Sequence, residues 1–197
     1  MPGQGTSEYI GIGLGSNLGD GKSIIQAAWQ RLGELGLNLL ALSSPYQTAP
    51  VSMTSAQDFI NAAGLATTRL SAQDVLKMLL EVETEFGRRR TESGEGYQDR
   101  SLDLDILFYG NTVIASGNLV IPHPQLAQRL FVLAPLAEIL PDWHHPLTGL
   151  GPFEMQQRLV GRILGGHAPQ QRINKQHWQK EQGLTHSSGR PAQSDKE

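Results

Sequence analysis

The chain has 197 residues, a net charge of −3 at pH 7 and no cysteine. The lack of cysteine excludes disulfides, thiolate metal sites and cysteine nucleophiles, and the negative charge argues against a general nucleic-acid binder, whose domain is normally basic. The N-terminus has no basic region followed by an apolar run, and no apolar stretch reaches the roughly eighteen residues that span a bilayer. We therefore expect a soluble, cytoplasmic protein that binds neither nucleic acid nor a membrane.

Strand and helix patterns alternate along the first half of the chain. The expected elements are a strand at 8–14, a helix at 24–32, strands at 38–48 and 58–67, a helix at 71–86 and a strand at 101–108. The helices follow from apolar residues spaced three and four apart, and Ser71 with Asp74 forms an N-cap signature for the second helix. The order β-α-β-β-α-β is that of the split-βαβ, ferredoxin-like motif, so we expect an α+β sandwich.

A cluster of glycines in the first strand region invites a dinucleotide-binding interpretation. Gly11, Gly13 and Gly15 lack the spacing of the third glycine, and no acidic residue follows a second strand at the required position. We interpret them as a tight turn from the first strand into the first helix.

Beyond the strand at 101–108 the pattern changes twice. A turn at 110–111 is predicted to enter a short ribbon, and the segment 121–124 leads into one or two helices that end by Leu140. From Gly165 onward apolar residues nearly vanish, which is the composition of disorder. We therefore divide the chain into an N-terminal extension at 1–7, a folded domain at 8–164 and a disordered tail at 165–197.

The most informative residues are Asp103 and Asp105, in the strand expected at 101–108. Side chains alternate between the two faces of a strand, so both carboxylates point the same way. Two like charges on one face repel each other, so we expect a cation beside them. Magnesium suits this place, because it takes one or two carboxylates and leaves its other positions to water and substrate phosphates. A half-exposed strand with a solvated acidic face is the alternative.

A second group of charges precedes this strand. Arg88, Arg89, Arg90 and Arg100 lead into it, and the planar guanidinium of arginine matches phosphate oxygens. Phosphates, magnesium and arginines can therefore meet in one cleft, unless the three consecutive arginines only complement the negative end of the preceding helix. His123, held between two prolines, suits a group that binds phosphate or manages a proton; a purely structural hydrogen bond is its alternative.

Four segments together resemble one family. Residues 100–110, Arg-Ser-Leu-Asp-Leu-Asp-Ile-Leu-Phe-Tyr-Gly, are similar to the signature of the 6-hydroxymethyl-7,8-dihydropterin pyrophosphokinases, and the segments 13–19, 48–63 and 121–136 agree with that family in order and spacing. The resemblance covers residues 8 to about 160. It implies an ATP-dependent diphosphotransferase of folate biosynthesis that moves pyrophosphate from ATP to the pterin hydroxymethyl group and releases AMP, with residues 8–164 as the pyrophosphokinase domain.

The same resemblance implies roles for individual residues. Asp103 and Asp105 would hold two magnesium ions that bridge the phosphates of ATP, the co-substrate. The residues implied to act on the phosphates in catalysis are Arg88, Arg100, His123 and Arg129. Those implied to bind the nucleotide are Glu83, Arg90 and Tyr97, the last at a position where tryptophan is common. The pterin would be held by Thr48, Val51, Phe59, Asn61 and Phe131, with the two phenylalanines on either side of its ring.

Two other functions stay open. A metal-dependent phosphohydrolase could use the same carboxylates and arginines with water and would need no pterin. A non-enzymatic ferredoxin-like module could bind nucleotide or RNA, although the net charge and the lack of an aromatic ribonucleoprotein motif argue against RNA. For the transferase we expect a monomer whose partners are ATP and a small pterin.

Overall fold

The computed structural model describes residues 7–50, 57–87 and 100–178. Its elements are β1 (Glu8–Ser16), α1 (Gly21–Glu34), β2 (Asn38–Leu42), β3 (Tyr46–Thr48), β4 (Phe59–Thr68), α2 (Ala72–Glu85), β5 (Asp103–Tyr109), β6 (Ile114–Ser116), β7 (Leu119–Ile121), a 3-10 turn (Leu126–Gln128), α3 (Leu130–Ile139), α4 (Pro152–Leu164) and β8 (Ile173–Lys175). Four residues predicted to belong to the site lie outside the described residues: Val51, Arg88, Arg90 and Tyr97. None of the helices within the described ranges is both long and apolar enough to cross a membrane.

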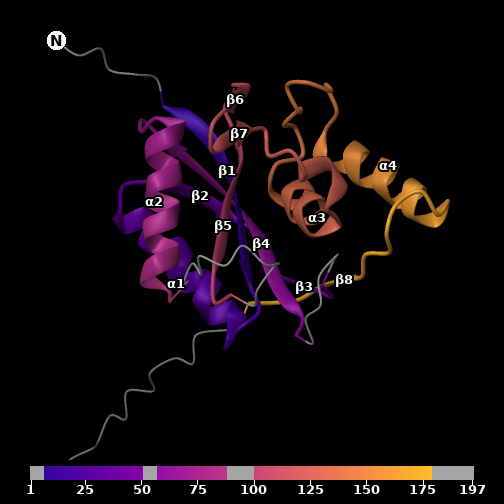
Figure 1. The fold of residues 1–197 in the computed structure, drawn as a ribbon, viewed down its shortest axis with the longest axis horizontal. Helices are drawn as coiled ribbons and strands as arrows, with labels where there is room; N and C mark the ends of the chain where they lie inside the picture. The colour runs from indigo at the N-terminus through magenta and orange to yellow at the C-terminus, as the bar shows by residue number, and fades with distance from the viewer. Residues whose placement is uncertain (1–6, 51–56, 88–99, 179–197) are drawn as a thin grey trace, which may run out of the picture.

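An antiparallel sheet forms the middle layer of the fold (Figure 1). In the described part of the chain it has six strands, in the order β5-β1-β4-β3-β8, with β2 pairing on a second stretch of β4. α1 and α2 pack on one face, and α3 and α4 cover the other (Figure 1). Each face has its own apolar core, with Ile10 and Leu79 in the first and Leu107 and Leu133 in the second. The expected mixed class, with α-helices on an antiparallel sheet, is confirmed.

The start of α2 follows the sequence signal. The backbone N of Asp74 donates a hydrogen bond to Ser71 Oγ at 3.1 Å, and Ser71 Oγ donates to Asp74 Oδ2 at 2.6 Å. The buried residues Val75, Leu79 and Val82 then recur at helical spacing and face the sheet. The predicted N-cap is therefore confirmed.

The single strand expected at 38–48 is interrupted and forms β2 and β3. At the break, the backbone N of Ala63 donates a hydrogen bond to Ser43 Oγ at 3.0 Å, where a regular ladder would offer a backbone carbonyl. Pro45 follows, and proline has no N–H to offer a neighbouring strand. The regular ladder therefore stops at this point and resumes at Tyr46.

The glycines near the N-terminus lie inside β1 and not in a turn, so the interpretation as a turn is wrong. β1 runs between β4 and β5, and a Cβ atom placed on Gly11 would lie only 2.1 Å from the ring of Phe108. Glycine is required there because a neighbouring strand's side chain lies across the backbone of β1. The turn into α1 comes later, with Gly19 at a φ of 70°.

The ribbon expected after residue 110 is present, since β6 pairs with β7. The first of the expected helices is α3. α4 lies beyond the helices predicted to end by Leu140 and was missed, although its start carries recognisable signals. Pro152 occupies the first turn, and Glu154 Oε2 accepts a hydrogen bond from the backbone N of Gly151 at 3.0 Å.

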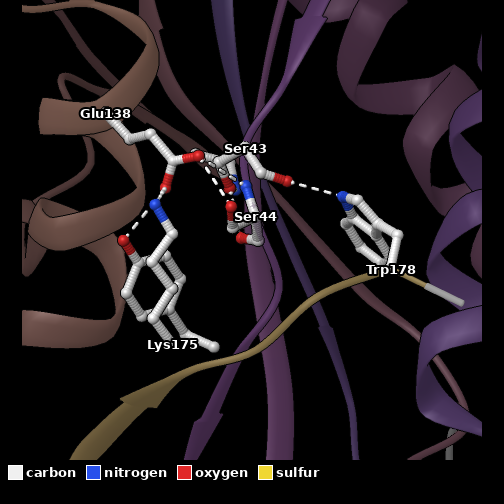
Figure 2. Close-up of polar contacts among 7 residues, drawn as sticks. Ser43, Ser44, Glu138, Lys175 and Trp178 are labelled. Carbon is white, nitrogen blue, oxygen red and sulfur yellow. Dashed lines mark hydrogen bonds and ion pairs between the residues drawn. The ribbon is translucent and has the colours of Figure 1, made fainter.

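The segment after α4 differs from the disordered tail expected from Gly165. Residues 165–178 have a defined path, and β8 pairs antiparallel with β3. Ile173 packs against the core on the α3 side of the sheet and Trp178 against the core on the α1 side. Trp178 Nε1 also donates to the backbone O of Ser43 at 3.0 Å (Figure 2). The prediction of disorder failed for these residues because it rested on average composition, in which a few widely spaced apolar residues such as Ile173 and Trp178 count for little.

Glu138, near the end of α3, ties this helix to the sheet (Figure 2). Its Oε1 accepts hydrogen bonds from the backbone N and from Oγ of Ser44, at 3.0 and 2.8 Å, and its Oε2 accepts one from the hydroxyl of Tyr46 at 3.0 Å. Lys175 Nζ on β8 lies 3.1 Å from Oε2. Burial raises the pKa of Glu138, but these hydrogen bonds outweigh burial and hold the pKa below its ordinary value.

Glu138→Gln is expected to lower the free energy of unfolding at pH 7 by about 2 kcal/mol, because hydrogen bonds to a charged group are lost. A carboxyl with a depressed folded pKa adds stability above its ordinary pKa and loses it as the pH falls through the folded value. The difference from wild type should therefore shrink as the pH is lowered below 4.5. Urea denaturation across this range, with the exposed Glu81→Gln as control, measures it; a difference that does not change with pH would contradict the assignment.

Candidate active site

A cavity of about 270 Å³ lies between the sheet and the layer of α3 and α4. Its sheet side includes Gly13, Gly15, Thr48, Phe59, Asn61, Asp103 and Asp105. Its other side includes Arg129 and Phe131 at the start of α3, Leu159 and Arg162 on α4, and Gln171. Arg100, just before β5, completes the rim. The cavity thus brings together most of the predicted residues that the structure describes.

The register of β1 places the carboxylates near Asn61. Gly15 pairs with Asp103 on one side and with Asn61 on the other, and Gly13 pairs with Asp105. A Cβ atom on Gly15 would lie 3.1 Å from Asn61 Oδ1 and 3.8 Å from Asp103 Cβ. Because these glycines have no side chains, the floor of the cavity stays open between the acidic strand and the strand that carries the amide.

Asp103 and Asp105 lie on one face of β5, as the alternation predicted, and both line the cavity. Arg100 Nη1 lies 2.7 Å from Asp103 Oδ1, and His123 Nε2 lies 3.9 Å from Asp105 Oδ2. Burial, and then the charge of Asp103, raises the pKa of Asp105. For His123 burial acts in the other direction and lowers the pKa, whereas the charge of Asp105 raises it. The site therefore holds two acids whose repulsion a divalent cation would relieve.

These residues fit a magnesium ion that is shared with a ligand. Within the described ranges no group of three or more histidine, cysteine, aspartate or glutamate residues could surround a metal. Magnesium commonly keeps only one or two carboxylates and takes its other ligands from water and phosphates. Two carboxylates on one face of β5, open to the cavity, match that requirement.

Neighbouring residues hold the backbone of Arg100 and contact the side chain of Arg129. Asn17 Oδ1 accepts a hydrogen bond from the backbone N of Arg100 at 2.7 Å, and the backbone N of Asn17 donates to Arg100 O at 3.2 Å. Arg129 contacts the side chain of Gln125, whose backbone N donates to His123 Nδ1 at 3.1 Å. Among the described residues three arginines line the cavity, Arg100, Arg129 and Arg162, and His123 reaches its edge through Asp105.

The apolar end of the cavity carries two aromatic rings and a buried amide. Phe59 comes from β4, and Phe131 comes from α3 on the opposite side. Asn61 is buried, and its Nδ2 donates to Thr48 Oγ1, also buried, at 2.8 Å. The guanidinium carbon of Arg129 lies 5.4 Å from the centre of the Phe131 ring, which joins the apolar end to the charged end.

Glu83 is not among the residues that line the cavity, and its contact with the nucleotide stays a prediction. It belongs to the buried stripe of α2, on the opposite face of the sheet, and is only 1% exposed. Its Oε1 accepts a hydrogen bond from the backbone N of Leu104 at 2.8 Å. Leu104 lies between the two aspartates, so Glu83 supports the strand that carries them.

Several cavity residues were not found from the sequence. Leu159 and Arg162 belong to the missed helix α4, and Gln171 lies in the segment assigned to a disordered tail. Asn17, in the segment 13–19, lies outside the cavity but holds Arg100 by hydrogen bonds, and no role was predicted for it from the sequence. The amphipathic pattern of α4 was the available signal for the first two, whereas Gln171 stands out only through its contacts in space.

Comparisons with known proteins agree on one family. The family model for 7,8-dihydro-6-hydroxymethylpterin-pyrophosphokinase (HPPK) matches residues 11–141. A Porphyromonas gingivalis relative, described as 2-amino-4-hydroxy-6-hydroxymethyldihydropteridine pyrophosphokinase, is 40% identical over 136 residues, which cover 68% of this chain and 92% of the relative. A folate synthesis bifunctional protein of Arabidopsis thaliana is 37% identical over 173 residues, 82% of this chain but only 35% of that protein.

A solved structure shows the same fold. The Plasmodium falciparum HPPK-DHPS wild type, crystallised with pteroate, superposes with a TM-score of 0.66 at 13% identity. The match covers 84% of this chain and 44% of that one. The chain thus spans about a third of the first curated relatives and less than half of this structural relative.

Proposed function

Because the chain belongs to the 7,8-dihydro-6-hydroxymethylpterin-pyrophosphokinase family, we propose that it transfers pyrophosphate from ATP to 6-hydroxymethyl-7,8-dihydropterin and releases AMP, a step of folate biosynthesis. The observation that carries the proposal is the content of one cavity: a carboxylate pair, three arginines and two aromatic rings. The charged groups suit a magnesium-bound triphosphate, and the rings suit a flat heterocycle.

Asp103 and Asp105 would hold two magnesium ions together with the phosphates of ATP. Bound there, magnesium would neutralise phosphate charge and lower the pKa of the pterin hydroxyl. Arg100 and Arg129 add positive charge near the transferred group and the departing AMP. His123, next to Asp105, would donate a hydrogen bond to a phosphate oxygen.

In this reaction the hydroxymethyl oxygen attacks the β-phosphorus of ATP. A new oxygen–phosphorus bond forms, and the bond between that phosphorus and the oxygen bridging to the α-phosphate breaks. AMP leaves with the electron pair of the broken bond, and the hydroxyl proton is released. The side chains position the two substrates in line and offset charge, which is the main contribution of a protein to such transfers.

The pterin would stack between Phe59 and Phe131, and Asn61, oriented by Thr48, would read the amide edge of the ring. A buried amide favours a ligand with the matching donors and acceptors, because an analogue that lacks them leaves it unpaired. The family resemblance assigns further contacts to residues in the parts of the chain that the structure does not describe: Val51 to the pterin, and Arg88, Arg90 and Tyr97 to the nucleotide.

The sheet order also favours a ferredoxin-like arrangement, with β5, β1 and β4 followed by β2 and β3, and both α1 and α2 on one face. The pyrophosphokinase domain would then be residues 8–164 together with 165–178, since the latter contribute to the cavity. A cytoplasmic location and a monomeric state remain predictions from the sequence.

The test is incubation with ATP, magnesium and 6-hydroxymethyl-7,8-dihydropterin, followed by mass analysis of the products. AMP and a diphosphorylated pterin in equal amounts are expected. ADP with a monophosphorylated pterin would reject the proposed transfer. Inorganic phosphate or pyrophosphate released in a parallel reaction without pterin would identify a phosphohydrolase, and binding of nucleotide without any product would identify a non-enzymatic module.

A further inference from the structure

The segment 165–178 lies outside the residues that match the family, 11–141, yet its residue Gln171 lines the cavity. We propose that Gln171 is a positioning residue: it caps the N-terminus of α3 from the C-terminal segment and so fixes Arg129 and Phe131 toward the cavity. The inference rests on the proposed function, because those two residues are proposed to contact phosphate and pterin.

α3 begins without a capping side chain of its own. Its N-cap residue is Arg129, whose side chain makes no capping hydrogen bond and, as a guanidinium, has no acceptor to offer. The first amides of a helix need acceptors from outside the helix. The backbone N of Leu130 donates to Gln171 Oε1 at 2.8 Å, across 41 positions of the chain. Gln171 therefore supplies an acceptor for the first amide of α3.

The same carboxamide also binds on the other side of Arg129. Gln171 Nε2 donates to the backbone O of Gln128 at 2.9 Å. One side chain thus joins the two peptide groups that flank Arg129. Any rotation about φ or ψ of Arg129, now −125° and 110°, would stretch one of these two hydrogen bonds, so both dihedral angles are restrained.

Two cavity side chains depend on this piece of backbone. Arg129 and Phe131 both line the cavity, and the guanidinium carbon lies 5.4 Å from the ring centre. Arg129 also contacts Gln125, whose backbone N donates to His123 Nδ1. A change in the backbone at Arg129 would therefore shift the aromatic wall and one of the cavity arginines together.

The segment that carries Gln171 is itself fixed along α3. Four residues further on, Lys175 Nζ lies 3.1 Å from Glu138 Oε2 near the end of the helix (Figure 2). From Leu130 to Glu138 the helix rises about 12 Å, and from Gln171 to Lys175 an extended chain spans about 13 Å. Because the lengths match, the segment contacts both ends of α3. Of the two contacts, only Gln171 lines the cavity.

The experiment compares Gln171→Ala with Gln170→Ala, a substitution of the exposed glutamine next to it. Gln171→Glu is the conservative variant, because it keeps an acceptor for Leu130 and a carboxylate is favourable at a helix N-terminus. Hydrogen exchange of the Leu130 amide measures the cap. Equilibrium binding of a non-hydrolysable ATP analogue, and of the pterin in its presence, measures the site.

In Gln171→Ala we expect exchange at Leu130 to be about tenfold faster and pterin affinity about tenfold weaker, as the loss of one or two hydrogen bonds implies. Affinity for the ATP analogue should also fall, because Arg129 moves together with Phe131, while the melting temperature should stay close to that of Gln170→Ala. Gln171→Glu, which keeps the acceptor for Leu130 but not the donor to Gln128, should recover slow exchange and part of the ligand affinity.

Equal pterin affinity in Gln171→Ala and Gln170→Ala would overturn the inference. So would a loss of ligand affinity that is accompanied by a large fall of the melting temperature, which a merely structural role predicts. If the wild type itself binds no pterin, the proposed function fails, and the positioning role toward pterin fails with it; exchange at Leu130 then still decides whether Gln171 caps α3.

Discussion

Asp105→Asn is expected to lower the turnover of pterin pyrophosphorylation by about a thousandfold without loss of stability. The substitution keeps the shape of the side chain and removes one of the two carboxylates proposed to hold magnesium. Burial and the charge of Asp103 raise the pKa of Asp105. A carboxyl whose folded pKa lies above its ordinary value costs stability while it is ionised, so the variant should unfold at pH 7 with an equal or higher free energy.

Rates of AMP release and chemical denaturation of the same preparation check both parts of this prediction. Asp103→Asn should lose activity to a similar degree, and the exposed Asp142→Asn, outside the cavity, is the control that should behave as wild type. Turnover of Asp105→Asn within a few-fold of wild type would refute the metal role. Loss of activity together with loss of folding would point to a structural role instead.

Phe131→Ala is expected to weaken pterin binding about thirtyfold while affinity for ATP changes less than about twofold, since stacking of a ring on an aromatic side chain is worth roughly 1–3 kcal/mol. Phe131 is half-buried and faces the cavity, so its truncation removes one wall of the proposed pterin site. The carboxylates and Arg100 belong to the sheet side and should be left in place.

Calorimetric titration with each ligand in turn measures this separation. Phe153→Ala is the matched control, because Phe153 lies on α4, is 61% exposed and does not line the cavity. If Phe131→Ala lost ATP and pterin affinity equally, Phe131 would be needed for packing of α3 and not for stacking. Unchanged pterin affinity would place the pterin elsewhere.

The features that depend on short-range patterns could be predicted from the sequence. The two-residue period of a strand put Asp103 and Asp105 on one face, and both line the cavity. The spacing of Ser71 and Asp74 located the start of α2, because a cap involves only neighbours along the chain. Family resemblance was needed for Phe59, Asn61 and Phe131, since aromatic and amide residues in a fold have no local mark that separates a binding wall from a core.

The features that depend on distant contacts could not be predicted. Glu83 has the sequence context of a solvated helix residue, and only the packing of α2 on β5 shows its carboxylate bound to the backbone of Leu104. Gln171 lies in a stretch of polar composition, and its contacts with α3 cross 41 positions of the chain. In both cases the partner is a backbone group, which every residue carries and which leaves no trace in the order of side chains.

The short strand β8 has a consequence beyond the cavity. Without it, β3 would present unpaired backbone groups at its outer side, and an open strand of this kind is a template for self-association and aggregation. β8 takes up those groups, and within the described residues it forms an edge of only three residues that carries a lysine, Lys175. Short length and a lysine are features with which natural proteins discourage edge-to-edge pairing. The residues of β8 therefore also discourage other chains from pairing with the sheet.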